Sequence, residues 1–145
     1  MNPVLLVLGL GVGAVMAIYL PLVGTMGRAL GSPVLATVPF FIVGLGAALV
    51  VTVLTGQTGE LSRITKLDPW LPLAGVGAFL MIVGSAHLIP RIGASLFFVV
   101  VVAGQLAVGA IVAHYGLLGS ATVPLTAQKL AGLALVVAGA WLAVR

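Results

Sequence analysis

The stretch SLFFVVVVAGQLAVGAIVAHYG, Ser95 to Gly116, decides the fold class of this chain. Its apolar run is as long as the roughly 18 residues by which a membrane-spanning helix is recognised. Near the middle of that run stands one amide side chain, Gln105. The stretch is typical of a transmembrane helix, and a polar group at its centre needs a physical reason.

The composition of the whole chain indicates the same environment. Of 145 residues, 62% are hydrophobic and only 6% are charged, and the mean hydropathy is +1.37. A soluble domain would need far more charge on its surface. The absence of cysteine excludes disulfides, thiolate catalysis and cysteine metal sites. The net charge of +4 comes from scattered basic residues, which excludes a nucleic-acid patch and suits lipid head groups.

Breaks in the hydropathy divide the chain into five apolar segments, which we expect to be five transmembrane helices of a single domain, residues 1–145. The predicted spans are residues 3–26, 34–54, 73–89, 94–113 and 129–144. The longest polar connection separates the second from the third. The fifth segment is short: at 1.5 Å per residue it covers about 24 Å of a hydrocarbon core about 30 Å thick.

The basic residues do not favour either orientation in the membrane. With five spans, one side carries Arg63, Lys66 and Lys129, and the other carries Arg28, Arg91 and Arg145. The bias that normally fixes topology is therefore absent. Either one span is miscounted, or the chain inserts both ways and forms an antiparallel dimer. Such a dimer has the inverted-repeat symmetry of many secondary transporters.

Three stretches carry a resemblance to a known family: GRALGSPVLATVPFFIVG, PRIGASLFFVVVVAGQL and HYGLLG. They resemble the YdcZ-like family, the short five-helix members of the drug/metabolite transporter superfamily. The resemblance implies a half-sized protein of the bacterial inner membrane that pairs with itself or with a sister five-helix subunit into a ten-helix unit. It also implies export or exchange of an unidentified small molecule.

The chain departs from the family pattern at three positions. Tyr19 stands where many members have Gln, Val23 where Asn is common, and Ala113 where Asp is frequent. Three polar positions are therefore apolar or aromatic here. The chain is then either the less polar half of a pair or a carrier of a more apolar substrate.

No Asp, Glu, Lys or Arg lies inside a predicted span, apart from groups at the ends. This argues against proton coupling through a carboxylate, and against an intramembrane enzyme. His87 is the candidate for titration, because histidine can change its charge near neutral pH. It is either an interfacial residue or a proton carrier in the pathway; His114, beside Tyr115, is expected at the interface. We expect no catalytic residue, no metal site and no cofactor.

Small residues in several spans indicate close packing of helices. Gly9 and Gly13 form a GxxxG pair in the first span, where Pro21 is expected to cause a kink or a break. In the fifth segment a stripe of alanines recurs at three- and four-residue spacing. Its members are Ala127, Ala131, Ala134 and Ala138. We expect Ala131, Ala134 and Ala138 to form the contact between the two copies.

Gln105 lies about halfway along its span, too far from either interface to reach water. Its amide makes an interhelical hydrogen bond, or it lines a pathway at the midplane of the bilayer. The second hypothesis describes a secondary transporter whose pathway is lined by Gln105, Tyr19, His87, Ser85 and Gly109. The alternative is an accessory subunit that pairs with a transporter but recognises no substrate.

Overall fold

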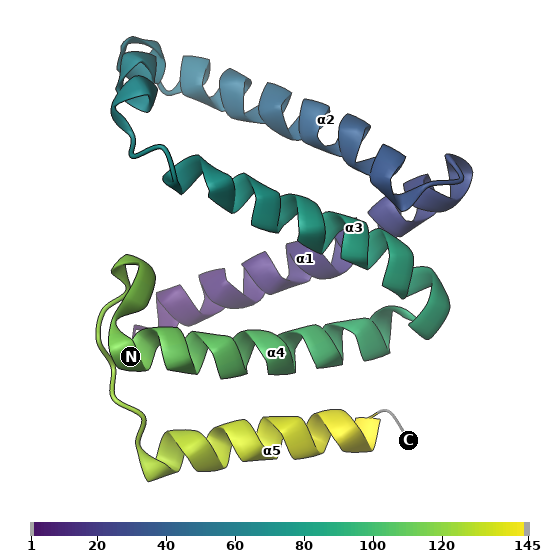
Figure 1. Cartoon of the computed structure of the whole chain (residues 1–145), viewed down its shortest axis with the longest axis vertical. Helices are drawn as coiled ribbons and strands as arrows, with labels where there is room; N and C mark the ends of the chain where they lie inside the picture. Colours follow the sequence, from purple (N-terminus) through teal and green to yellow (C-terminus); the bar gives the residue numbers. More distant parts are fainter. Residues whose placement is uncertain (1, 144–145) are drawn as a thin grey trace. The chain divides into compact units, whose positions relative to one another are not determined.

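The computed structural model describes residues 2–143, and its helices are shown in Figure 1. Among these residues the α-helices are α1 (Pro3–Ala29), α2 (Pro33–Leu54), α3 (Ala74–Ile92), α4 (Ala94–Tyr115) and α5 (Ala127–Ala143). Short 3₁₀ helices lie in the connections, at Gln57–Lys66, Leu71–Leu73 and Leu117–Gly119. No strand occurs in the part of the chain that the structure describes. The prediction of an all-α protein is confirmed.

Four helical stretches within residues 2–143 are long and apolar enough to cross a membrane: residues 3–29, 33–54, 71–92 and 94–115. The fifth helix, α5, is apolar but has only 17 residues. At 1.5 Å per residue it is about 26 Å long, somewhat shorter than a hydrocarbon core of about 30 Å. A fifth span therefore stays a prediction. Its predicted end at Val144, and Arg145 beyond it, lie outside the described residues.

Caps and glycines set the ends of the helices. Asn2 and Ser32 accept hydrogen bonds from the backbone N–H groups of Val4 and Leu35, at 3.0 and 3.3 Å. In each case a proline follows the cap as the first helical residue, where its missing N–H costs nothing. Gly93, with φ of +81°, allows α4 to begin directly after α3 ends, because few other residues adopt positive φ readily.

The chain divides into two compact units, residues 1–91 and 92–145. In the first unit α1 and α2 pack as a hairpin, with the rings of Tyr19 and Phe40 stacked at 5.6 Å. The C-terminal half of α1 also meets α3. A Cβ atom at Gly27 would lie 3.5 Å from the Cβ of Ala86, and one at Gly24 would lie 3.6 Å from the ring of Pro90. The side chains of Leu20, Val23, Ile82, Ser85 and Ile89 are buried in this unit.

Pro90 helps to explain why a small residue lies at this contact. A proline has no N–H, so the carbonyl of Ala86, four residues earlier, loses its usual donor in α3. The backbone of Gly27 lies beside that carbonyl: its Cβ position is 3.8 Å from the oxygen of Ala86. A Cβ atom at these distances makes ordinary van der Waals contacts, so only a side chain larger than that of alanine would push the two helices apart. The close contact of α1 with α3 therefore depends on a small residue at position 27.

The structure bears on two expectations about α1. The helix continues through Pro21 without a break, because a proline removes only one hydrogen bond and neighbouring turns hold the helix together in an apolar setting; a kink at Pro21 stays a prediction. The predicted GxxxG pair, Gly9 and Gly13, makes no close contact in the single chain, since no atom lies within 4 Å of either Cβ position. The glycines that do pack closely are Gly24 and Gly27.

In the second unit α4 and α5 lie side by side, joined by the 3₁₀ turn 117–119 and an extended segment (Figure 1). We call residues 120–126 of that segment the strap. The α4 helix ends at Gly116 with φ of +63°. A Cβ atom there would lie 2.6 Å from Oγ1 of Thr122. Glycine at 116 is thus required both by the backbone and by the strap that packs on it.

Candidate functional site

Gln105 lies at the midpoint of α4, and its amide is exposed. Its side chain makes no hydrogen bond to any residue that the structure describes. Several hydroxyl side chains within the helices differ in this respect. Thr52 and Ser85, for example, donate to carbonyls of their own helices, at 2.8 Å each. An amide without a partner is costly in hydrocarbon, so Gln105 needs a partner from outside the pair of helices α4 and α5.

Three apolar grooves run between α4 and α5, and two of them border the face of α4 that carries Gln105. The larger, of about 560 Å³, is lined from α4 by Leu106, Gly109, Ala110 and Ala113, from the strap by Val123 and Leu125, and from α5 by Lys129, Gly132, Leu133 and Val136. The smaller, of about 280 Å³, is lined by Phe98, Val99, Val102, Val136, Gly139 and Ala140. Lys129 supplies the only charged side chain of either lining.

Gln105 lies between these grooves on the surface of α4. Val102 in the smaller groove is three residues before it, and Gly109 in the larger is four residues after it, so all three share one face of the helix. Nothing lies within 4 Å of a Cβ position at Gly109. The predicted pair of Gln105 and Gly109 is therefore together on one face, next to open space.

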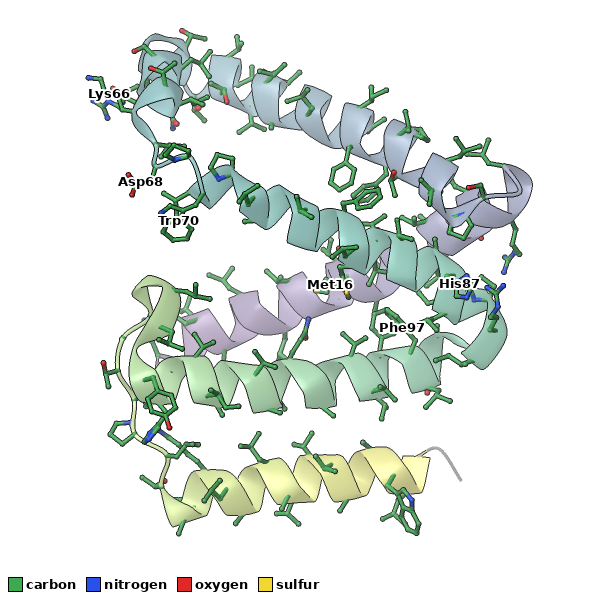
Figure 2. All side chains as sticks on the ribbon, in the orientation of Figure 1. Met16, Lys66, Asp68, Trp70, His87 and Phe97 are labelled. Carbon is green, nitrogen blue, oxygen red and sulfur yellow. The ribbon has the colours of Figure 1, made fainter. Side chains whose placement is uncertain are left out.

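The other predicted pathway residues belong to the first unit, and they are not together. Tyr19 stacks on Phe40 and borders an apolar hollow along α1. Ser85 is fully buried, and its hydroxyl donates to the carbonyl of Ile82 at 2.8 Å. His87, two residues further, is exposed near the end of α3 (Figure 2). The two residues face different sides of α3, because successive residues of a helix are about 100° apart.

His87 and Arg91 form the polar end of α3. The guanidinium of Arg91 donates to the backbone carbonyl of His87 at 2.6 Å, a contact within the last two turns of the helix. The His87 imidazole has no hydrogen-bond partner among the described residues. Its position suits either an interfacial residue or a proton carrier at the mouth of a pathway, and both interpretations stay open.

The strap brings a second histidine into a defined contact, which the sequence did not predict. The backbone N–H of Leu125 donates to Nδ1 of His114 at 3.1 Å, and the N–H of Val123 donates to the carbonyl of Ala113 at 2.8 Å. The ammonium group of Lys129 donates to the carbonyl of Pro124 at 2.9 Å. No periodicity in the sequence could indicate these bonds, because they join residues five to eleven positions apart across a turn.

The alanine stripe of α5 lies on the opposite side of the helix from the larger groove. Lys129, Gly132, Leu133 and Val136 face α4 in that groove. Ala131, Ala134 and Ala138 lie about half a turn away from them at 3.6 residues per turn, and all three are exposed. The predicted dimer contact is therefore unoccupied within its own unit, and it stays a prediction.

Among the described residues, no three His, Asp or Glu side chains gather as metal ligands would. The two carboxylates, Glu60 and Asp68, lie in the connection between α2 and α3, where Glu60 pairs with Arg63 on the surface. Figure 2 shows Asp68 there with Lys66 and Trp70. Charged side chains thus gather at the ends of the long helices and leave the apolar interior of each helix without a charge.

The long apolar helices and the placement of charge at their ends define a multi-pass membrane protein. Residues 4–142 match the family described as "Putative inner membrane exporter, YdcZ", and the chain belongs to that family. It is accordingly a multi-pass protein of the inner membrane, from a family of transporters rather than enzymes. No curated protein and no solved structure matches the chain.

Proposed function

We propose that this chain is one half of a small-molecule exporter, in which two copies associate antiparallel around a pathway at the midplane of the membrane. The observation that carries the proposal is the Gln105 amide, which is exposed at the middle of α4 and has no partner among the described residues. Substrate, water or the second copy would supply the missing hydrogen bonds.

The position of Gln105 along its helix supports an antiparallel pairing. The α4 helix runs from residue 94 to residue 115, so Gln105 is at its centre. A twofold axis in the plane of the membrane inverts each copy but leaves a central residue at the same depth. The two amides then face each other, while residues at the ends of the two α4 helices are separated by the thickness of the bilayer. The three-to-three distribution of basic residues supports the same arrangement.

The linings of the grooves support an apolar or amphiphilic substrate. Ala113, at the position where the family often has Asp, lines the larger groove, and Val23, where Asn is common, is buried in the first unit. In the larger groove Gly109 leaves space beside the amide. A small molecule with one hydrogen-bonding group and an apolar body would suit Gln105 and these walls.

The test is Gln105→Leu in the purified full chain, reconstituted in liposomes. We expect transport per folded protein to fall by about fivefold, since one good hydrogen bond to substrate is worth on the order of 1 kcal/mol. The flux assay uses a panel of apolar cations, zwitterions and neutral amphiphiles. Thermal stability of the variant should stay close to that of the parent protein, because no hydrogen bond within the chain is lost.

Thr52→Val is the matched control, because it removes another polar group from the interior of a helix. The Thr52 hydroxyl already donates to Ala48 in its own helix at 2.8 Å, so the variant should transport normally. Lost stability with normal transport per folded protein would make Gln105 a structural contact between helices of the dimer. Absence of flux for every compound, with a stable dimer, would favour the accessory-subunit alternative.

A further inference from the structure

We propose that His114 is a proton-sensitive latch, which holds the strap against α4 when neutral and releases it when protonated. The use of this latch in transport rests on the proposed function, but the latch itself is a property of the second unit alone. Its basis is one contact, the hydrogen bond from the Leu125 N–H to Nδ1 of His114 at 3.1 Å.

The direction of that bond fixes the protonation state of the ring. A backbone N–H can only donate, so Nδ1 must accept and carries no proton. In the neutral imidazole the single ring proton is then on Nε2. A second proton can bind only at Nδ1, which turns the acceptor into a donor. Protonation of His114 therefore breaks the bond and leaves two N–H groups facing each other.

The other bonds that hold the strap do not titrate in this way. The N–H of Val123 donates to the carbonyl of Ala113 at 2.8 Å. The hydroxyl of Ser120 donates to the carbonyls of Val112 and Leu117, at 3.2 and 2.8 Å. These carbonyls keep their acceptor character at any physiological pH. The ammonium group of Lys129, bonded to Pro124, keeps its proton near neutral pH. Among the described residues, His114 is thus the one point at which a proton taken up near neutral pH changes how the strap is held.

The groups around His114 in the second unit include one cation and one aromatic ring, but no carboxylate. Lys129, whose ammonium group is bonded to Pro124 beside Leu125, is a cation on the neighbouring helix α5. The Tyr115 ring lies edge to face with the imidazole, at 4.8 Å between centroids. Residues 92–145 contain no Asp or Glu side chain. Within the described part of this unit, no carboxylate can accept a hydrogen bond from a protonated Nδ1 in place of the lost bond to Leu125.

Release of the strap would open the larger groove. Val123 and Leu125 belong to the strap and form part of the wall of that groove. In an antiparallel dimer the two straps are at opposite faces of the membrane, and each responds to the pH of its own compartment. A pH difference would then release one strap and keep the other closed, which is the asymmetry that an alternating-access exporter requires.

The experiment measures the mobility of the strap by spin labelling. The chain has no cysteine, so Ala121→Cys places a single nitroxide label on the exposed strap without removing any of its hydrogen bonds. In the reconstituted full chain, we expect the mobile fraction of the label to rise about threefold from about pH 8 to about pH 5.

Two substitutions of His114 separate a latch from a general effect of acid. His114→Asn keeps an acceptor oxygen near the place of Nδ1 but cannot titrate, so the label should stay immobile at both pH values. His114→Ala removes the acceptor, and the label should be mobile at both. His87→Asn, at the other histidine, should respond like the parent. An unchanged response to pH in His114→Asn, or no response in the parent, would overturn the proposal, whatever the result for Gln105→Leu.

Discussion

The contact of α1 with α3 and the contact of α4 with α5 are built in opposite ways. In the first, glycines bring two backbones together, and the side chains of Leu20, Val23 and Ser85 are almost fully buried. In the second, no atom lies within 4 Å of the Cβ positions of Gly109 and Gly132, and these small residues line an open groove. Small residues thus serve two purposes in one chain. They close a helix contact in the first unit, and they leave room beside Gln105 in the second.

The largest loss of stability is expected from a bulky side chain in the contact of α1 with α3. Gly27→Leu places a side chain where a Cβ atom alone already lies 3.5 Å from both Ala86 and Pro33. Overpacking of this kind costs on the order of 1–3 kcal/mol, and we expect a clear loss of folded protein and of thermal stability. The measurement is size-exclusion chromatography with a thermal melt in detergent.

Gly132→Leu is the control for this prediction, since nothing lies within 4 Å of its Cβ position. It should leave the folded monomer nearly as stable as the parent. If Gly132→Leu destabilises the chain as much as Gly27→Leu does, the contrast between the tight contact of α1 with α3 and the open groove between α4 and α5 is wrong.

A smaller effect is expected at the strap. Gly116→Ala forces an alanine into a positive φ, which costs about 1–2 kcal/mol, and also creates a clash with Thr122. Gly119→Ala also places an alanine at a positive φ, of +75°, but it creates no clash, because nothing lies within 4 Å of the Cβ position at residue 119. Thermal melts should rank Gly116→Ala as the less stable of the two, and Thr122→Ala should recover part of the difference. Equal stabilities would show that the strap does not pack on Gly116.

The smallest effect on the single chain is expected on the outer face of α5. Ala134→Leu with Ala138→Leu should leave the fold intact and weaken dimerisation by about tenfold, because bulky residues keep helix backbones apart in lipid. Single-molecule photobleaching in liposomes measures the dimer fraction. Val137→Leu, on the same helix but off the stripe, is the control. Unchanged dimerisation would place the contact elsewhere, with the Gly9–Gly13 face as the next candidate.

The hydropathy of the sequence was sufficient to predict the helices, but not their ends. The first predicted span stops at Met26, whereas α1 continues to Ala29 and includes Arg28 in its last turn. Hydropathy detects only the extent of the apolar run. The helix itself ends where a residue adopts a non-helical backbone conformation, here Gly31 with φ of +67°. Polar residues in the last turn can reach the interface and do not interrupt the helix.

The sequence predicted the candidate site only in part. Gln105 was found because an amide inside an apolar run is conspicuous, and Gly109 because it follows one turn later. Gly24 and Gly27 were not found, since spacing alone does not show which glycines meet another helix. The bond between His114 and Leu125 was not found either, because it depends on how the strap folds back on α4.

The antiparallel arrangement around α4 is tested most directly by two single-cysteine variants, which the absence of native cysteine makes possible. Ser95 is ten residues before Gln105, or about 15 Å along the helix. In an antiparallel pair the two Ser95 positions are therefore about 30 Å apart in depth, whereas the two Gln105 positions are at the same depth. A direct disulfide needs Cα atoms about 4.4–6.8 Å apart, which is too close for two residues on either side of a pathway. We therefore predict that a bifunctional thiol reagent much shorter than about 30 Å links Gln105→Cys into a dimer in the membrane and does not link Ser95→Cys. Cross-linking through Ser95→Cys, or none through Gln105→Cys, would contradict the proposed exporter architecture.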